Sequence, residues 1–377
     1  MLKPLYKIVK RKTTFMSLRL YWIAFLLLWG SAHVAMAQRI AKYGSDFLAG
    51  GVGARALGMG GAYTALTTDV TAGYWNPAGL NGLAFPELAY MHAERFAGVV
   101  SFDYAGIAFP VSARSTVGIS LIRSGVNDIK NTLDAWDATR NLPKPNPEIY
   151  FRTFSAADYA LFLSYAKMLS SAWSVGISGK IVRRTIGEFA DAWGYSIDVG
   201  IRLHQRNWLV GAVLQDATTL LQSWSVNKEA LRNLVEVFEG IMPEGGTELT
   251  LPVLRLGGAY HGTYREWKAL VSMDLALAFD GQKTYALNTG MISYHPRLGA
   301  EVSFRDQVAL RMGMHRLIIG PEGWSVSPTV GAGIHLRQFY IDYGFGNFAG
   351  LPAELGFSHR ISLRVELDHP RWKRKPE

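Results

Sequence analysis

From residue 87 to residue 367 the sequence alternates between apolar and polar residues, and this alternation constrains the fold more than any other feature. In segment 195–203, Tyr, Ile, Val, Ile and Leu occupy the odd positions, whereas Ser, Asp, Gly and Arg occupy the even positions. Segment 267–279 has one continuous apolar face with aromatic ends and a second face that carries Lys268, Ser272 and Asp274. A period of two residues places successive side chains on opposite faces of a β-strand. The sequence therefore predicts an all-β protein whose strands each have one apolar and one polar face.

Two architectures use such strands in opposite ways. A soluble sandwich hides the apolar face in a core, whereas a membrane barrel turns it toward lipid and lines its lumen with the polar face. The segments are about 9–13 residues long, which suits tilted strands that cross the hydrocarbon layer better than the shorter strands of soluble proteins. Tyr and Trp recur at segment ends, as at membrane interfaces, and glycines recur on the polar face, where they leave room for a filling segment. The aromatic residues are Tyr159, Tyr165, Trp173, Trp193, Tyr195, Trp208, Tyr260 and Trp267, and the glycines are Gly118, Gly176, Gly200, Gly211, Gly257 and Gly313. These features favour a transmembrane antiparallel β-barrel.

The lengths of the connections support the barrel independently. We expect about 14 strands, an even number as in bacterial single-chain barrels, at 87–94, 97–109, 115–124, 157–169, 171–184, 193–204, 206–215, 252–261, 267–279, 285–304, 308–318, 326–336, 338–346 and 355–367. The two long insertions, 125–156 and 216–251, both follow odd-numbered strands, so both emerge on one side, while short turns follow the even-numbered strands. Segment 285–304 contains Pro296 and is compatible with one bulged strand or with two short ones.

The first 37 residues have the layout of a secretory signal peptide. A basic region without acidic residues precedes an apolar run from Leu20 to Trp29, and Ala35-Met36-Ala37 forms an A-x-A cleavage site. The apolar run is about ten residues long, too short for a membrane-spanning helix. We expect cleavage after Ala37 and an outer-membrane location; the translation start is open between Met1 and Met16.

The formal net charge of +9 lies at the two ends of the chain. Of its 39 Lys and Arg residues, six fall in the first 37 residues, which leaves 33 against 30 Asp and Glu. Residues 371–377, within the basic tail 368–377, carry the remaining excess of three, so the barrel 87–367 is close to neutral and nucleic-acid binding is not expected. We expect this periplasmic tail to be solvated and disordered, with a contact to something periplasmic or anionic as the alternative. The chain contains no cysteine, which excludes disulfides and thiol chemistry.

Residues 38–86 do not alternate and are rich in glycine, and we interpret them as a hatch that fills the lumen. Asn76 is expected to cap a turn or short helix that begins at Pro77. Inside a barrel Arg55 needs a carboxylate partner, and Asp69 is the nearest candidate in the sequence. The glycine spacing at 51–56 is not a dinucleotide fingerprint, because no strand precedes it in a βαβ unit. The hatch residues we single out are Gly53, Arg55, Gly58, Gly60, Gly61, Asp69, Trp75, Asn76, Pro77 and Gly79.

The run Gly53-Ala-Arg-Ala-Leu-Gly-Met-Gly-Gly-Ala62, followed by Trp75-Asn-Pro-Ala-Gly-Leu80, resembles the N-terminal signature of the PorV/PorQ family, a branch of the FadL-like outer-membrane proteins. Segments 299–313 and 355–363 are also similar to this family. The resemblance implies a 14-stranded barrel with its N-terminal hatch inside the lumen. PorV-type members act with the type IX secretion machinery, where they collect exported proteins from the translocon and pass them to surface attachment. The chain departs from the family at Thr68-Asp69, where an acidic pair is often found.

Two functions of different classes are therefore expected. The first is a non-enzymatic accessory or shuttle of type IX protein secretion, with secretion components and exported cargo proteins as partners. The alternative is a FadL-like channel for long-chain fatty acids or other hydrophobic solutes, which needs an apolar pocket leading past the hatch to a lateral opening. Both functions use the same scaffold, so the sequence does not separate them.

An enzyme is not expected, and neither a cofactor nor a metal site is predicted. The sequence contains no G-x-S-x-G elbow and no H-E-x-x-H helix, and its histidines lack ligand spacing. A helix is predicted over 227–240, with Asn227 as its cap and with Leu231, Leu234, Val235 and Phe238 on one face. This face either covers the barrel rim or forms an external surface for a partner.

Overall fold

The computed structural model describes residues 39–40, 46–96, 98–137, 139–140, 142–231, 244–279, 287–288, 292–320, 323–347 and 357–374. The chain divides into two units, Met1–Arg39 and Ile40–Glu377, and the fold below is that of the second unit. The predicted signal peptide lies outside the described residues.

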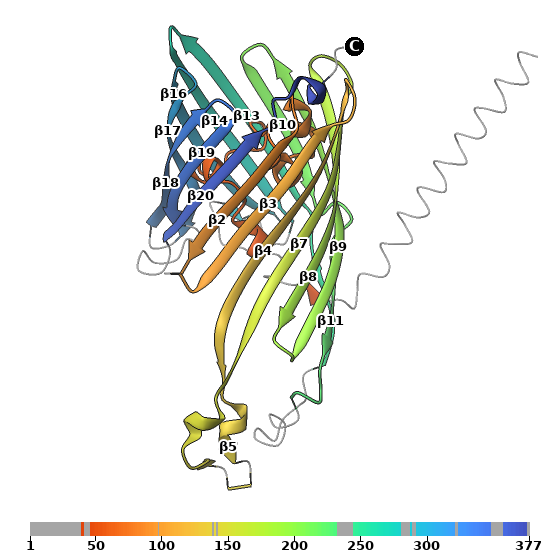
Figure 1. Cartoon of the computed structure of the whole chain (residues 1–377), viewed down its shortest axis with the longest axis vertical. Helices are drawn as coiled ribbons and strands as arrows, with labels where there is room; N and C mark the ends of the chain where they lie inside the picture. Colours follow the sequence, from red (N-terminus) through yellow and green to blue (C-terminus); the bar gives the residue numbers. More distant parts are fainter. Residues whose placement is uncertain are drawn as a thin grey trace, which may run out of the picture. The chain divides into compact units, whose positions relative to one another are not determined.

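The wall of the second unit is a closed ring of 14 antiparallel strand positions. Each strand pairs with the next along the chain, and the last strand pairs with the first through Met91 and Ser362, which closes the ring. The positions are β2 (Glu87–Arg95), β3 (Val100–Pro110), β4 (Ser115–Asn131), β7 (Arg152–Met168), β8 (Trp173–Ile186), β9 (Ala190–Gln205), β10 (Trp208–Gln215) with β11 (Leu220–Val226), β12 (Thr247–Thr250) with β13 (Val253–Tyr264), β14 (Trp267–Ala278), β16 (Ser293–Phe304), β17 (Val308–Gly320), β18 (Gly323–Leu336), β19 (Phe339–Asn347) and β20 (Phe357–Glu366). The prediction of an all-β antiparallel barrel is confirmed, and every expected strand is present (Figure 1).

The apolar face of the strands points outward. Val271 is 60% exposed and Leu310 66% exposed, while their inward-facing neighbours Ser272 and Arg311 are buried. Exposed tryptophans stand beside the short turns, as an interfacial aromatic girdle requires. An exterior of this kind suits lipid rather than water, so the sandwich with its apolar face in a core is not the fold of this chain.

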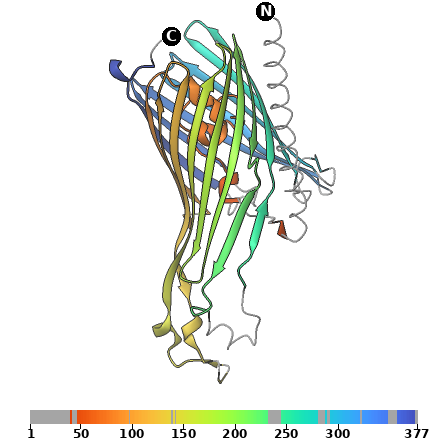
Figure 2. The same cartoon turned by 90° about the vertical axis from the view of Figure 1, so that its right-hand side faces the viewer.

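The two ends of the barrel differ in the length of their connections. Turns such as 110–115 and 205–208 are short, whereas both long insertions leave the opposite end, as predicted. The first insertion is partly a continuation of β4 and β7, whose hairpin extends well past its neighbours (Figure 2). Its tip holds only small elements: η3 (Leu133–Ala135), β5 (Trp136–Asp137), β6 (Leu142–Pro143) and η4 (Pro147–Tyr150). By the rule for outer-membrane barrels the short turns face the periplasm and the long connections face outward.

Pro296 lies inside a single strand. Residues 293–304 form β16, in which Pro296 is opposite Leu275 of β14, and a two-residue strand, β15 (Leu287–Asn288), precedes it. Of the two alternatives for 285–304, the structure has one long strand and one very short one.

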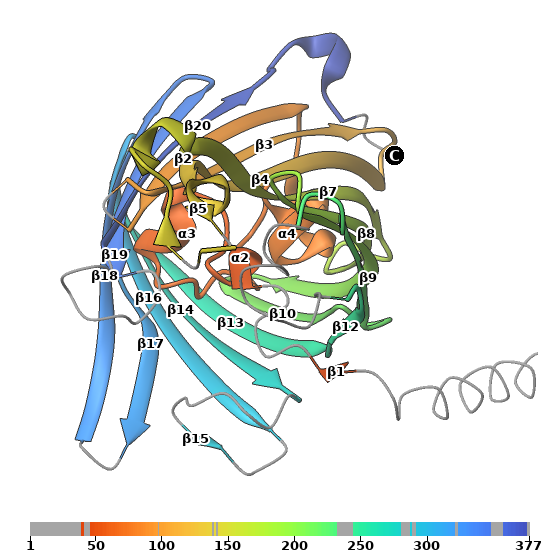
Figure 3. The same ribbon diagram turned by 90° about the horizontal axis from the view of Figure 1, so that it is seen from below.

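The hatch lies inside the ring (Figure 3). It consists of α2 (Asp46–Ala49), α3 (Ala54–Gly58), α4 (Ala72–Trp75) and η2 (Pro77–Gly82), joined by turns. Its helices are short because glycines interrupt them: Gly60 and Gly61 have φ angles of 64° and 74° and turn the chain after α3. Among the described residues no helix has the length and hydropathy that crossing a membrane requires.

All six glycines predicted to face the lumen contact or closely approach the hatch. A Cβ added to them would lie between 2.1 Å (Gly200, to Asn76 Oδ1) and 3.3 Å (Gly118, to Leu80 Cδ1) from the hatch atom that it meets first. The other four, Gly176, Gly211, Gly257 and Gly313, meet backbone atoms of residues 59–78 within the same range. The alternation of the strands thus predicted not only the barrel but also the surface that holds the hatch.

The C-terminal tail differs from its prediction. The backbone N–H groups of Leu367 and Arg374 donate to the carbonyls of Pro86 and Ala84, at the end of the hatch segment just before β2. A turn of 3-10 helix, η5 (Pro370–Trp372), lies between these two bonds. The described part of the tail is therefore anchored at both ends instead of being disordered, although Asp368, His369, Pro370, Trp372 and Lys373 are exposed to solvent; residues 375–377 lie outside the described residues.

Candidate functional site

The hatch is held on one side of the lumen by charged residues. Arg55 of α3 donates two hydrogen bonds to the carboxylate of Glu301 in β16, over 2.9 Å and 2.7 Å. Arg311 in β17 binds the same carboxylate and donates to Asp342 in β19 over 2.7 Å. This arrangement is an alternating network of two cations and two anions that joins the hatch to three strands. Bidentate arginine–carboxylate pairs are among the stronger hydrogen-bonded contacts in proteins.

The prediction that Asp69 is the partner of Arg55 is wrong. Asp69 accepts hydrogen bonds from the Tyr63 hydroxyl (3.1 Å) and the Thr71 backbone N–H (2.9 Å), and its nearest cation is Arg364, at 3.9 Å. Burial raises the pKa of Asp69, but Arg364 and the Thr71 hydroxyl outweigh burial and hold this pKa below its ordinary value. The turns after α3 point Arg55 at β16 and Asp69 at β20, so closeness in sequence does not become a contact.

Other barrel side chains bind the hatch backbone. Asp274 accepts from the N–H groups of Tyr63 and Thr64, over 3.1 Å and 2.9 Å. Arg360 donates to the carbonyls of Gly50 and Gly51, over 2.9 Å each. Hatch helices this short leave many backbone groups unpaired, and these inward side chains satisfy several of them. Sequence reasoning missed Asp274, Glu301, Arg311, Asp342, Arg360 and Arg364 as a group, although all occupy inward positions of the alternation.

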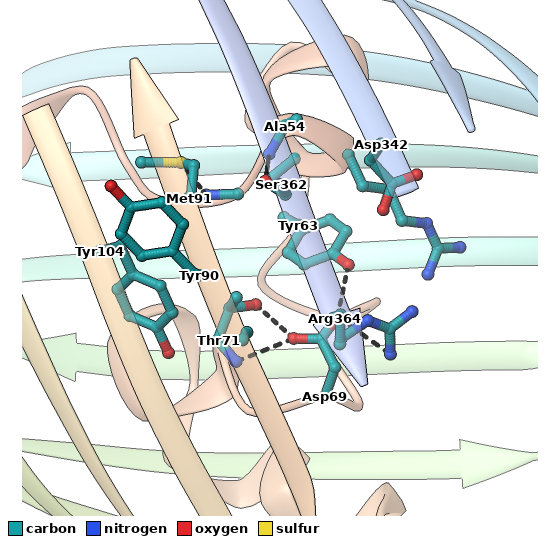
Figure 4. Close-up of a pocket in the computed structure, with 14 residues that line it drawn as sticks. Ala54, Tyr63, Asp69, Thr71, Tyr90, Met91, Tyr104, Asp342, Ser362 and Arg364 are labelled. Carbon is teal, nitrogen blue, oxygen red and sulfur yellow. Dashed lines mark hydrogen bonds and ion pairs between the residues drawn. The ribbon is translucent and has the colours of Figure 1, made fainter. Parts of the chain in front are cut away.

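We call Arg55, Asp69, Asp342 and Arg364, with Glu301 and Arg311, the charged seam. A small cavity of about 20 Å³ lies beside it (Figure 4). It is bounded by Arg55, Tyr63 and Asp69 of the hatch and by Tyr104 and Arg364 of the wall. Its volume is enough for about one water molecule, whereas a cavity of about 150 Å³ is needed for benzene. The charged seam therefore suits water and ions, not a hydrophobic molecule.

On the opposite side of the lumen, apolar side chains gather among inward-facing polar residues of the same strands, such as Ser120, Ser164 and Lys180. Inward-facing Phe102, Ile122, Phe162 and Val182 of β3, β4, β7 and β8 are buried in one cluster with hatch residues. The hatch contributes its own apolar side chains to the cluster, namely Phe47, Leu48, Val52, Tyr74 and Trp75. The rings of Tyr74 and Phe162 meet edge to face, with centroids 5.9 Å apart. A polar lumen is usual for a membrane barrel, so this group of buried apolar side chains within it is a distinct feature.

The barrel wall is interrupted next to this apolar side. The ladder between β10 and β13 ends at Gln215 and Val253, and it resumes between β11 and β12 at Leu220 and Thr250. We call the unpaired residues between these points, Asp216–Thr219 and Leu251–Pro252, the wall break. Leu220, the first residue beyond it, is fully buried in the apolar cluster.

A buried ion cluster holds the wall break to strand β9. The ammonium of Lys180 lies 3.3 Å from Asp198 and 2.7 Å from Asp216. The backbone N–H of Asp216 donates to the Asp198 carboxylate over 2.7 Å, and that of Ala217 donates to the Ile197 carbonyl over 2.8 Å. Lys180 and Asp198 are almost completely buried, so this cluster has lost the screening of water. The wall break is thus closed by a few polar contacts in place of a continuous ladder.

The signature residues after Asp69 fix the inner structure of the hatch. The indole N–H of Trp75 donates to the Val52 carbonyl over 2.9 Å. Asn76 accepts from the Ala78 N–H over 3.2 Å, with Pro77 at the first position of η2, which confirms the predicted cap. Asn76 also donates to the Ile201 carbonyl of β9, over 3.1 Å. A Cβ on Gly79 would lie 2.3 Å from the Thr67 carbonyl oxygen, so only glycine fits there.

The glycines before Asp69 let α3 approach the wall. Gly53 precedes α3 with a φ of 88°, which favours glycine. A Cβ on Gly58 would lie 3.0 Å from Gly331 Cα, and one on Gly60 would lie 2.6 Å from backbone atoms of Leu298 and Met314. A Cβ on Gly61 would meet the Arg297 side chain at 3.4 Å.

The predicted external surface is described only at its start. Asn227 accepts a hydrogen bond from the N–H of Ala230 over 3.3 Å, as an N-cap would. Leu231 is half-buried in a turn, and Leu234, Val235 and Phe238 lie outside the described residues. Among the described residues no group of three or more His, Cys, Asp or Glu side chains is placed to hold a metal ion.

No protein-family model matches the sequence, and no curated protein matches it. Solved structures do resemble it. The CymD monoaromatic hydrocarbon channel aligns with a TM-score of 0.56 and 14% identity over 85% of this chain and 98% of that chain. The P. putida toluene transporter TodX aligns with a TM-score of 0.51 and 13% identity over 85% of this chain and 99% of that chain. At such identities the likeness establishes the fold alone, and the closer PorV/PorQ resemblance stays a prediction. The chain therefore shares the barrel fold of these channels.

Proposed function

We propose that this chain is an outer-membrane channel that passes hydrophobic small molecules between its hatch and the apolar side of its lumen. The observation that carries the proposal is the apolar group on the inner wall, in which Phe102, Ile122, Phe162 and Val182 face the hatch. A channel for hydrophilic solutes has no use for such a surface, since apolar walls cannot replace the hydration of a polar solute. A hydrophobic solute gains about 25 cal/mol for each Å² that it removes from water there.

The wall break gives this route an exit into lipid. The apolar cluster extends from Phe102 near the outer opening to Leu220, which adjoins the wall break. A hydrophobic solute that reached Leu220 would leave sideways, because the periplasm is aqueous and the surrounding bilayer is not. The contacts of Lys180 with Asp198 and Asp216 then serve as the closure of the exit.

Passage requires the hatch to move. Phe47, Leu48 and Trp75 occupy the apolar side of the lumen, so a solute must displace them. The displaced state is a minor one that the solute stabilises by binding, which is how a ligand shifts a conformational equilibrium. The charged seam on the opposite side would keep the hatch attached to the wall while its apolar face opens.

A disulfide between hatch and wall tests whether this movement is needed. On the apolar side, a Cβ on Gly73 of α4 would lie 3.7 Å from the Cβ of Ser164 in β7, which is the usual Cβ–Cβ spacing of a disulfide. The natural chain has no cysteine that could interfere. In cells that lack other channels for hydrophobic solutes, G73C/S164C is expected to take up labelled toluene or a labelled long-chain fatty acid only after reduction. Each single cysteine variant serves as a control that transports under both conditions. Equal uptake by the oxidised and the reduced double variant would contradict the proposal.

A second candidate is an accessory role in type IX protein secretion. The observation that favours it is the exposed tip of the β4–β7 hairpin, where Leu142 is 60% and Ile149 71% exposed. Exposed apolar side chains on an outward extension suit a protein partner. This role predicts that the chain co-purifies with type IX components and that its deletion depletes surface-attached proteins. If the chain kept both properties after removal of residues 133–151, the tip would not be the surface that binds the partner.

A further inference from the structure

Four outward-facing side chains form a row across the outer half of the barrel. Arg123 of β4 is opposite Tyr159 of β7, Tyr159 is opposite Arg183 of β8, and Arg183 is opposite Trp193 of β9. These registers place the four residues side by side on one face of the sheet, about 4.8 Å apart from strand to strand. We call Arg123, Tyr159, Arg183 and Trp193 the outer row.

The outer row marks the edge of the apolar belt. Two residues closer to the periplasm on the same strands stand Leu121, Ile181 and Tyr195, which are large, apolar or aromatic, and exposed. Two residues farther out stand Gly125, Thr185 and Asp191. A boundary of this kind coincides with the level where lipid hydrocarbon gives way to headgroups. The row therefore faces the headgroups of the outer leaflet.

The outer row is positively charged at this level. The guanidinium of Arg183 lies over the Trp193 ring, 5.2 Å from its centroid, and no described carboxylate lies within ion-pair distance of it. The neighbouring acid on β7, Asp158, faces the lumen and is bound to Arg184. Arg123 donates to the Ser101 hydroxyl over 3.0 Å and lies 3.8 Å from Asp103, so its charge is only partly balanced.

We infer that Arg123 and Arg183 bind a phosphate group of an outer-leaflet lipid between them, across Tyr159. The two Cα atoms are two strand spacings apart, about 10 Å, and two arginine side chains can converge on one phosphate over that span. The planar guanidinium matches phosphate geometry with two parallel hydrogen bonds. Trp193 stacks on Arg183 and limits the rotamers that must be ordered when the lipid binds. The site is independent of whichever solute the lumen carries.

The alternative is that the two arginines only reach toward the aqueous layer without a specific ligand. Such arginines would respond to any anionic surface in the same way. A specific phosphate site differs in requiring both arginines and the phosphate itself. These requirements set the design of the test.

Binding of diphosphoryl lipid A to the purified barrel, measured by native mass spectrometry, tests the inference. R123Q/R183Q is expected to bind this lipid at least tenfold more weakly than the unaltered chain, which corresponds to the loss of about 1.4 kcal/mol or more. R140Q removes an arginine that is 77% exposed at the tip of the β4–β7 hairpin and should leave the affinity unchanged. Lipid A without phosphates should bind both proteins weakly, and inorganic phosphate alone should not compete at equal concentration.

Unchanged lipid affinity in R123Q/R183Q would overturn the inference, and so would equal binding of phosphorylated and phosphate-free lipid. Competition by inorganic phosphate would also contradict it, because the ligand would then be a free anion. The single variant R183Q removes the arginine that lacks a carboxylate partner and should already weaken binding. Heat-dependent mobility of the barrel on a gel reports whether each variant folds. If the double variant does not fold, R183Q provides the test.

Discussion

Replacing Lys180 with methionine is expected to destabilise the barrel by about 3–5 kcal/mol, the usual result of removing one partner from a buried ion pair. The variant K180M leaves Asp198 and Asp216 buried beside each other without their cation. Repulsion between the two carboxylates weakens the contacts that close the wall break, so the variant should also pass hydrophobic solutes faster. Denaturant unfolding of the barrel in lipid vesicles measures the first effect, and uptake measures the second.

Two further variants show whether the charge itself is responsible. Adding D198N and D216N to K180M removes both uncompensated charges, keeps an oxygen at each position, and should restore most of the lost stability. K268M breaks an ion pair with Asp306 in which both side chains are half exposed, and it should cost no more than about 1 kcal/mol. If K180M were as mild as K268M, the cluster would not hold the wall together.

Replacing Gly313 with valine is expected to prevent the hatch from docking. A Cβ at this position of β17 would lie 2.2 Å from the Gly60 nitrogen and 2.5 Å from the Met59 carbonyl carbon, and both are backbone atoms that cannot rotate away. Overpacking of this kind usually costs about 1–3 kcal/mol and sometimes more. Because the whole hatch must shift, G313V should lose stability at the upper end of that range and should conduct ions through the vacated lumen.

The matched control is G258A, a change at an outward-facing glycine of β13. A Cβ at Gly258 would meet nothing within 4 Å. Alanine loses less conformational freedom than glycine on folding, so this variant should be slightly more stable than the unaltered chain. Current measurements across planar bilayers separate the two variants. Wild-type conductance in G313V would mean that the hatch does not pack against β17 as described.

The barrel was predictable because its signal is repeated fourteen times. A single segment such as 195–203 is weak evidence for a membrane strand, but the same alternation in every segment, with inward glycines at Gly200 and Gly313, leaves few other folds. The position of the hatch followed from the same data. Small residues on the lumen face need a filling segment, and residues 38–86 were the part of the chain that did not alternate.

The partners inside the lumen were harder to predict. Arg55 and Glu301 are separated by 246 residues, and the alternation says only that Glu301 points inward, not how high or at what angle. Closeness in sequence suggested Asp69, but the turn at Gly60 and Gly61 sends the two side chains toward different strands. Contacts of this kind depend on how the ring closes, which no local pattern records.

The wall break and the tail were missed for different reasons. Residues 216–251 read as one loop, because the interruption at Asp216–Thr219 hides the short strand β11 that follows it. The tail was expected to be disordered because it is basic and terminal. Its order comes from backbone bonds to Ala84 and Pro86, and a backbone bond leaves no mark on the sequence.

Photolabelling with a diazirine derivative of an aromatic hydrocarbon, followed by mass spectrometry of the labelled peptides, tests the solute route most directly. The route described above predicts labels on Phe102, Phe162 and Leu220 and on the wall break, and it predicts that excess toluene competes with these labels. Labels confined to lipid-facing residues such as Leu310 and Met312, unaffected by toluene, would contradict the passage of hydrophobic solutes through this lumen.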